Sequence, residues 1–498
     1  MHGGDDRQVT PPAPMRYLVL AACSLAACTS LQQPMVPTGA DAVPAAWQGA
    51  AVVGTPTDLI DWWTRLGDPA LPPLVAEALA QGTDVAAAQA RLRQARAARD
   101  VGAAGLRPSI GSSASAKASQ NEGQAHSQLW SAGLDASWEL DLWGGGAAGL
   151  RAAEATLQAS TLSLAQTRVV VAAEVATSLV ALRGAQTRQA IAERNLTSQQ
   201  QTLQIVMWRQ EAGLVTALDV AQARTTVEQT RAQIPALRSS AEQSMHALSV
   251  LTGRAPGALA STLVAAGSTQ PLAPETLMLA MPAEVLRQRP DVQSAERQLV
   301  AAAARVEQSD AARLPSLSLG GSLGLSALRA SSLASGAGVA SLLASVSLPV
   351  FDFGRLQAQV QQQEAARDEA AASYRATVLA ALQEVEDNLV ALAAGRGQLT
   401  AQQAAAEAAR EAADLAVQRY RSGLVDFQSV LSSQRTQLSA EDSVAVTLTS
   451  LATSQVRLFK ALGGGWTPDS APGAADDPAA PIATPQATVR QTTATAAN

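Results

Sequence analysis

Strict alternation of apolar and polar residues marks four short segments of this chain. In WSAGLDASWELDLW, residues 130–143, every even position is apolar or aromatic, and the acids Asp135, Glu139 and Asp141 fall on odd positions. A period of two over this length predicts a strand with two different faces. Similar alternation predicts strands over about 108–119, 315–327 and 341–352. Each segment is near the roughly 9–11 residues that cross a membrane at a tilt.

Long alanine-rich stretches with helical character follow each pair of strands. They run over about 147–212 and 355–421, and a second helix follows each after a turn, over about 216–252 and 426–461. Roughly 65 residues at about 1.5 Å each make a rod about 100 Å long. These stretches contain no run of about 18 uncharged apolar residues. We therefore expect coiled-coil-like helices in water and no transmembrane helix.

The two halves of the chain repeat one another. Glu174-Val175 recurs 210 residues later as Glu384-Val385, and Asp84-Val85 recurs 207 residues later as Asp291-Val292. A period this long indicates a duplicated helix-strand-strand-helix unit rather than a solenoid of short repeats. The predicted domains are a leader and signal peptide at 1–27, a tether at 28–69, a first repeat at 70–252, a connector at 253–274, a second repeat at 275–462 and a disordered tail at 463–498.

The N-terminal region has the features of an export signal. Translation can start at Met1 or Met15, and an apolar run extends to Ala27. Its end, Leu25-Ala26-Ala27-Cys28, resembles a bacterial lipoprotein cleavage box, in which the cysteine becomes the acylated first residue of the mature chain. The alternative is an ordinary signal peptide with incidental cysteines. In either case the mature protein is exported and has no disulfide.

The net charge and the positions of the histidines argue against two kinds of function, nucleic-acid binding and metal binding. Lys and Arg total 36 against 42 Asp and Glu, for a net charge of −6, and no basic stripe exists, so nucleic acid is not an expected partner. The three histidines lie far apart and have no ligand-spaced partners: His2, His126 and His246. We therefore expect no metal site.

One glycine motif suggests a cofactor. Gly144, Gly146 and Gly149 spell GxGxxG after a strand, but this strand carries acids where a dinucleotide-binding strand is uniformly apolar. A hinge between strand and helix explains the glycines better. We expect no cofactor and no enzyme activity.

Four two-faced strands cannot close a barrel alone. Open edges in lipid leave backbone groups unsatisfied, so copies of the chain must complete the barrel. Eight strands would be filled by side chains, so a trimer with twelve is the smallest assembly that conducts. The acids Asp135, Glu139 and Asp141 would then face the lumen and bias it toward cations. The aromatic residues would be lipid-facing or interfacial anchors: Trp130, Trp138, Trp143, Phe351 and Phe353. A soluble two-layer sheet with one wet face is the alternative.

Several motifs together resemble the TolC/NodT family of outer-membrane efflux factors. They are the box ending in Cys28, LRQRPDV at 286–292, the Gly-Leu-Val turns at 213–215 and 423–425, and ALGGGW at 461–466. The resemblance covers about residues 50–466. It implies an α+β membrane protein: a homotrimer whose twelve-stranded barrel stands on a periplasmic tunnel of twelve long helices, tethered to the outer membrane by lipid on Cys28.

The resemblance also implies roles for residues near the turns. The family's adaptor-docking surface corresponds to Gly213, Leu214, Val215, Gly423, Leu424 and Val425. A tyrosine–aspartate link that closes the tunnel corresponds to Tyr420 and Asp219, for which the alternative is plain surface polar residues near a turn. Where the family has a latching arginine and carboxylate rings, this chain has Val425, Ser429 and Ser432. We therefore do not expect the periplasmic entrance of the tunnel to bind cations strongly.

The expected function is a passive exit duct. In the family, a periplasmic adaptor (a membrane fusion protein) and an inner-membrane pump open the tunnel, and nothing is catalysed. The alternative is a lipid-anchored structural or adhesive trimeric coiled coil. The duplicated turns and the serine and glycine faces of the strands favour the duct.

Overall fold

The computed structural model describes residues 44–48, 52–53, 59–120, 127–265, 278–279 and 282–466. The chain divides into two units, Met1–Thr38 and Gly39–Asn498, and every described residue belongs to the second unit. Several predictions lie outside the described residues: the signal peptide, Cys28, much of the tether, part of the connector, and the tail beyond Trp466.

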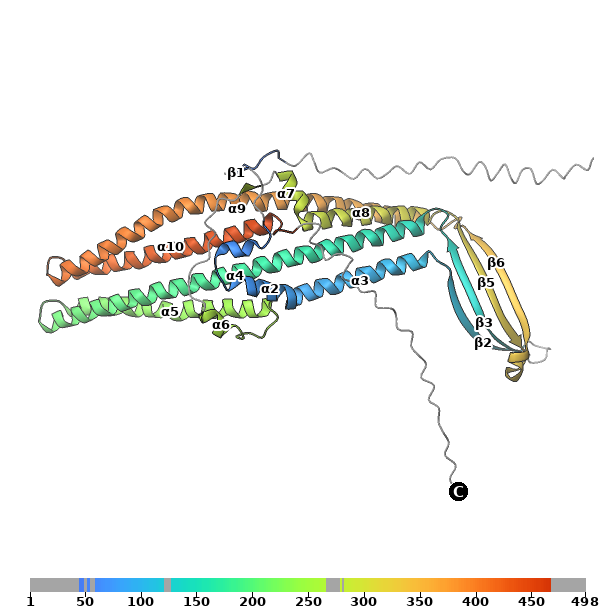
Figure 1. Cartoon of the computed structure of the whole chain (residues 1–498), viewed down its shortest axis with the longest axis horizontal. Coiled ribbons are helices and arrows are strands. Elements are labelled where there is room, and N and C mark those ends of the chain that lie inside the picture. The colour runs from blue at the N-terminus through green and yellow to red at the C-terminus, as the bar shows by residue number, and fades with distance from the viewer. Residues whose placement is uncertain are drawn as a thin grey trace, which may run out of the picture. The chain divides into compact units, whose positions relative to one another are not determined.

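The described elements follow the same order in both halves (Figure 1). The first half contains α2 (Leu71–Gln81), α3 (Thr83–Gly105), β2 (Ser109–Ser119), β3 (Ser127–Leu140), α4 (Gly145–Glu211) and α5 (Ala217–Leu251). The second contains α7 (Pro282–Gln288), α8 (Pro290–Ala311), β5 (Ser316–Ala327), β6 (Ala337–Ser347), α9 (Arg355–Arg421) and α10 (Phe427–Ala461). Shorter elements are β1 (Val52–Val53), η3 (Trp62–Leu66), α6 (Ala260–Ala265), β4 (Met278–Leu279) and η4 (Ala330–Ser335).

The two long helices, α4 and α9, have 67 residues each, and α5 and α10 have 35 each. At about 1.5 Å per residue the long helices extend about 100 Å. One 18-residue window of α4 is apolar enough to cross a membrane, but 61% of that window is buried inside the protein. Residues such as Val175, Leu179 and Leu182 are fully buried against neighbouring helices. The window therefore belongs to the core of a helix bundle.

Small residues allow α4 to pack closely against α8. A Cβ added to Gly145 would lie 3.0 Å from the Ala311 Cβ, and one added to Gly149 would lie 2.9 Å from the Gln308 amide nitrogen. Further along, the Ser294 hydroxyl donates to the Ala159 carbonyl at 3.1 Å. The abundance of alanine and glycine in α4 thus has a packing reason.

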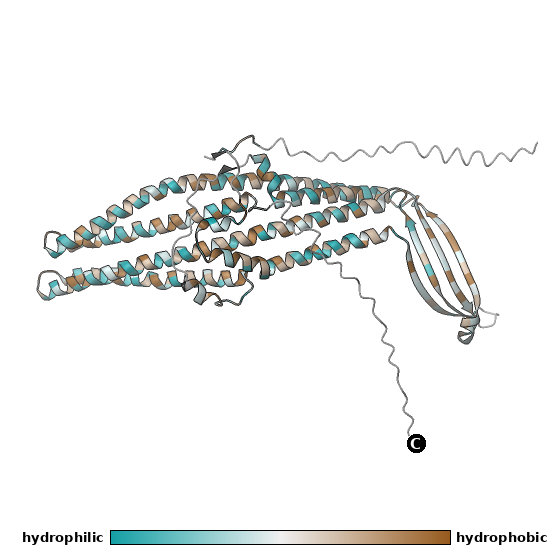
Figure 2. Ribbon diagram, viewed as in Figure 1, coloured by the Kyte–Doolittle hydropathy of each residue, from teal (hydrophilic) through white to brown (hydrophobic). Residues whose placement is uncertain are grey.

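The four longer strands form one antiparallel sheet in the order β2-β3-β5-β6. Strands β2 and β6 are its edges, so neither has a partner on its outer side within the described chain. Hydrophilic residues are frequent along the helices and sparse in these strands (Figure 2). The short β1 and β4 pair in parallel, Val52 with Met278.

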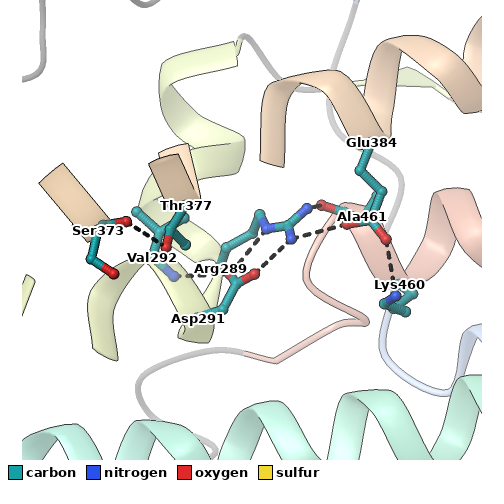
Figure 3. Close-up of polar contacts among 8 residues, drawn as sticks. All are labelled: Arg289, Asp291, Val292, Ser373, Thr377, Glu384, Lys460 and Ala461. Atoms are coloured by element: carbon teal, nitrogen blue, oxygen red, sulfur yellow. Dashed lines mark hydrogen bonds and ion pairs between the residues drawn. The ribbon is translucent and has the colours of Figure 1, made fainter. Parts of the chain in front are cut away.

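A buried arginine connects the start of α8 with the end of α10 (Figure 3). Arg289 donates from Nε and Nη2 to the Asp291 carboxylate at 3.0 and 2.7 Å, and from Nη2 to Glu384 at 3.0 Å. Its Nη1 donates to the Ala461 carbonyl at 2.8 Å. The pKa of Arg289 is raised: its burial acts to lower it, but the hydrogen bond and charge of Asp291 and those of Glu384 outweigh burial. The sequence motifs at 286–292 and 461–466 therefore meet in space.

Three successive glycines after α10 fit where no side chain can. Gly463, Gly464 and Gly465 all have positive φ, between 61° and 95°. A Cβ on Gly464 would lie 2.7 Å from a Val169 methyl, and one on Gly465 would lie 2.2 Å from the Leu59 carbonyl oxygen. Glycine adopts this backbone conformation without steric cost.

Candidate functional site: the strand sheet and the helix tips

One face of the sheet, here called the polar face, is lined mainly by serine and glycine. The strand register places Asp135 opposite Gly111 and Ser322, and Glu139 opposite Ser318. Hydroxyl pairs at 2.7–2.9 Å bridge neighbouring strands on this face: Ser109–Ser137, Ser115–Ser131, Ser119–Ser127, Ser318–Ser345 and Ser322–Ser341. Such cross-strand pairs stabilise the sheet and leave a hydroxyl surface that water wets.

Sequence analysis missed one charge on the polar face. Lys117 shares this face with Asp135 and Glu139 but lies opposite Leu129, near the strand ends that are remote from the helices. Lys117 has an odd position number in β2, so alternation alone would have placed its side chain on the polar face. The acids lie toward the helical end of the sheet, so the charge changes sign along the face.

The other face of the sheet is apolar and exposed. Leu134, Leu323, Leu342 and Val346 leave 53–86% of their surfaces accessible on this face. A large exposed apolar surface on a folded chain indicates contact with lipid or with another protein.

Two of the predicted aromatic anchors are fixed to the backbone where strands meet helices. The Trp138 indole donates to the Leu106 carbonyl at 3.1 Å, and the Trp143 indole donates to the Pro315 carbonyl at 2.7 Å. Phe351 and Phe353, after β6, are exposed and lie 4.6 Å apart by ring centroid. Polar indole N–H groups beside an apolar face are typical of a membrane interface.

The strands end at other residues than predicted, and Asp141 lies just after β3 rather than within it. Strand β3 begins at Ser127 and ends at Leu140, and β6 covers Ala337–Ser347 rather than about 341–352. The Asp141 carboxylate instead accepts hydrogen bonds from the N–H groups of Gly146 and Ala147 at 3.0 and 2.7 Å. It thus caps the start of α4, because the first N–H groups of a helix have no partner within the helix. Asp352 caps the start of α9 in the same way, through Leu356.

The glycines of the GxGxxG motif have structural roles at this junction. Gly144 precedes α4 with φ of 74°. A Cβ on Gly146 would lie 2.6 Å from a Leu106 methyl, and Gly149 faces Gln308 on α8. The motif is explained by a turn and close packing.

The far ends of the long helices, here called the helix tips, are two similar turns between α4 and α5 and between α9 and α10 (Figure 1). The Leu214 N–H donates to the Arg209 carbonyl at 2.8 Å, and the Leu424 N–H donates to the Arg419 carbonyl at 2.9 Å. Gly213 and Gly423 have φ of 72° and 74°. This is a Schellman ending, which needs a left-handed residue after the helix.

The remaining predicted tip residues divide into two kinds. Leu214 and Leu424 leave 65% and 74% of their surfaces exposed. Val215 and Val425 instead pack against an apolar cluster that joins the two hairpins, here called the tip cluster: Val206, Val220, Ala223, Tyr420, Phe427, Val430 and Leu431. The leucines are therefore available for contact with another protein, whereas the valines anchor the turns.

No hydrogen bond joins Tyr420 to Asp219, the pair that the resemblance implies, within the described part of a single chain. The Asp219 carboxylate accepts from the Thr216 N–H at 2.9 Å and from the Thr216 hydroxyl at 2.8 Å, completing a capping box at the start of α5. Tyr420 is 2% exposed, and its hydroxyl has no hydrogen-bond partner among the described residues. Within one chain Asp219 stabilises the start of its own helix, and the link between Tyr420 and Asp219 stays a prediction for the assembled protein.

A residue that sequence analysis missed contacts Tyr420. The Arg209 guanidinium, at the end of α4, lies 4.5 Å from the centre of the Tyr420 ring, and its Nη1 donates to the Tyr420 carbonyl. Burial raises the pKa of Tyr420; the charge of Arg209 acts in the opposite direction, and that of Asp219 adds to the rise. The tyrosine is therefore neutral at physiological pH.

Comparison with known proteins identifies the class. The model of a family described as outer membrane efflux protein matches residues 74–254 and 281–464. The pyoverdine export outer membrane protein OpmQ of Pseudomonas aeruginosa is 34% identical over 466 residues, covering 91% of this chain and 97% of that protein. Outer membrane protein OprJ of the same species is 32% identical over 469 residues, covering 90% and 94%.

A solved structure supports the same class of protein. The outer-membrane channel OprN superposes with a TM-score of 0.77 at 34% identity, covering 85% of this chain and 95% of that one. The chain belongs to the outer membrane efflux protein family, which confirms the resemblance drawn from its motifs. It is an outer-membrane efflux channel, so the export duct is favoured over the structural coiled coil.

Proposed function

We propose that three copies of the chain form a twelve-stranded barrel in the outer membrane, continuous with a periplasmic tunnel of twelve helices. The outer edges of β2 and β6, which pair with no strand of the described chain, carry this proposal. In lipid, each unsatisfied backbone group costs several kcal/mol, so an edge strand must pair with the edge of another copy. A closed ring of four-stranded sheets satisfies every edge, and twelve strands leave room for water.

The assembled barrel would conduct passively. Its polar face, with hydroxyl pairs and few charges, would line the lumen, and its apolar face would contact lipid. Asp135 and Glu139 would form acidic positions in the lumen near the tunnel, whereas Asp141 would act as a helix cap.

The duct would be the exit stage of a tripartite efflux system. Membership in the outer membrane efflux protein family supports a periplasmic adaptor and an inner-membrane pump as partners. The adaptor would dock on the helix tips, where Leu214 and Leu424 present exposed apolar side chains on rigid turns. The six tips of a trimer would form a closed periplasmic end that the partners open, with Tyr420 inside the closure and Asp219 fixing the start of α5. Acylated Cys28 would add a lipid anchor.

Native mass spectrometry of the detergent-purified protein tests the assembly. We expect three copies, and cysteines placed on the facing edges of β2 and β6 should crosslink between copies and not within one. A monomer, or crosslinks that never join two copies, would contradict the proposal.

A further inference from the structure

The helix tips contain one cationic contact between the two hairpins of a chain. Arg209 comes from the last turn of α4, and Tyr420 comes from the last turn of α9. The guanidinium lies over the tyrosine ring at 4.5 Å and also donates to the tyrosine carbonyl. A guanidinium suits this position because its planar, delocalised charge stacks on an aromatic ring while its N–H groups remain free to donate.

The tyrosine hydroxyl takes no part in this contact. It is buried in the tip cluster without a partner among the described residues, and the ring packs 5.8 Å from Phe427. Asp219 is held by Thr216 within its own capping box. The ring and the main chain of Tyr420, rather than its hydroxyl, therefore connect the hairpins.

We propose that Arg209 is the positioning residue that holds the two hairpins of each protomer together at the helix tips and so sets how readily the duct opens. This inference rests on the proposed function. Opening that separates the hairpins must move the Tyr420 ring and carbonyl away from the guanidinium. The apolar tip cluster and, further along the helices, the hydrogen bonds from Gln434 to Thr202 and from Arg435 to Thr226 would then hold the hairpins together.

The repeat supplies a matched control. Arg419 occupies the same place as Arg209, four residues before a turn glycine, but its side chain is exposed. The residue that corresponds to Tyr420 in the first hairpin is Gln210, which has no ring for Arg419 to cover. Of the two described turns, the contact therefore forms at Arg209 and not at Arg419, and the two arginines differ in their surroundings but not in their local helix ending.

The test is the open probability of purified trimers in planar lipid bilayers. Loss of a cation–π contact corresponds to roughly a two- to thirtyfold shift of the equilibrium, so Arg209→Gln should raise the open probability by a factor in that range. Tyr420→Ala should act in the same direction. Arg419→Gln should leave the open probability unchanged. Tyr420→Phe keeps the ring and Asp219→Asn keeps the helix cap, so each should raise the open probability less than Arg209→Gln does.

The outcomes separate this inference from the proposed function. If Arg209→Gln matches wild type while Tyr420→Phe or Asp219→Asn opens the channel, a tyrosine–aspartate link operates and Arg209 does not set the opening. Equal effects of Arg209→Gln and Arg419→Gln would also overturn the inference. If correctly assembled trimers conduct in no variant, the duct itself is refuted. Thermal unfolding of the Arg209→Gln and Arg419→Gln trimers, expected to stay close to that of wild type, excludes loss of folding as the cause of opening. Tyr420→Ala removes a buried ring and should unfold at a lower temperature.

Discussion

At the scale of single residues, Glu441 shows how charges are held between the long helices. Its side chain is 6% exposed and accepts hydrogen bonds from Arg410 of α9 at 2.9 Å and from Asn195 of α4 at 3.0 Å. Gln437, one turn earlier on α10, donates as well. Burial acts to raise the pKa of Glu441, but the hydrogen bonds from Gln437, Arg410 and Asn195 outweigh it, so the pKa is lowered. The ionised carboxylate connects three helices.

We predict that Glu441→Gln destabilises the protein by about 1–3 kcal/mol at pH 7, because the amide replaces one acceptor oxygen by a donor and can leave the buried Asn195 amide without an acceptor. Because the pKa of Glu441 is lower in the folded protein than in the unfolded chain, its ionisation stabilises the fold at any pH above the unfolded-state pKa. This stabilisation is lost as the pH falls through the folded-state pKa. Wild type and variant should therefore converge in strongly acidic solution. Thermal unfolding followed by circular dichroism at a series of pH values measures this.

The neighbouring Asp442 supplies the control for that variant. It pairs with Arg188 at 2.7 Å, but both side chains are more than a third exposed. Exposed ion pairs contribute little, so Asp442→Asn should change stability by less than about 1 kcal/mol. If Glu441→Gln and Asp442→Asn lowered the free energy of unfolding equally, burial would not determine how much each carboxylate stabilises the protein.

Residue-level sequence analysis located the tips but not the contact within them. The Gly-Leu-Val turns and Tyr420 were found from the repeat and the family resemblance. Arg209 and Arg419 stand at equivalent positions, and nothing local in the sequence says which one covers an aromatic ring. That depends on how α4 packs beside α9 and α10, which is a tertiary property.

At the scale of elements, alternation predicted the strands and their two faces but not where they end. The odd positions continue past Leu140 to Asp141, yet this acid caps α4. Alternation cannot separate the last strand residue from a following helix cap, because both positions accept a polar side chain. Similarly, β6 ends at Ser347, before the predicted limit, and Asp352 caps α9.

This distinction predicts ion selectivity. Asp135→Asn combined with Glu139→Gln should lower the cation-to-anion permeability ratio toward unity, since these acids lie on the polar face. Asp141→Asn should leave the ratio unchanged, because that carboxylate faces the N–H groups of α4. Reversal potentials in asymmetric salt measure both ratios. A shift from Asp141→Asn as large as that from the double variant would place Asp141 in the conduction path.

At the scale of the whole molecule, two attachments to the outer membrane are proposed. The barrel is inserted through its apolar face, and the lipid on Cys28 adds to it. We predict that Cys28→Ser abolishes labelling by radioactive palmitate but leaves the protein in the outer-membrane fraction. Cys23 ends the same four residues, Leu-Ala-Ala-Cys, at 20–23, so Cys23→Ser is the matched control and should leave labelling unchanged. Persistent labelling of Cys28→Ser would show that another residue carries the lipid.

We propose that the serine-lined face of the sheet surrounds a water-filled path and that the opposite face contacts lipid. Asp135 and Leu134 are neighbours on β3 and lie on opposite faces. The most direct test is single-channel current through Asp135→Cys and Leu134→Cys trimers before and after a charged, membrane-impermeant thiol reagent is added, with wild type treated in parallel. We predict that the reagent reduces the current through Asp135→Cys and leaves the other two unchanged. An equal reduction in both cysteine variants, or none in either, would contradict the assignment of the two faces.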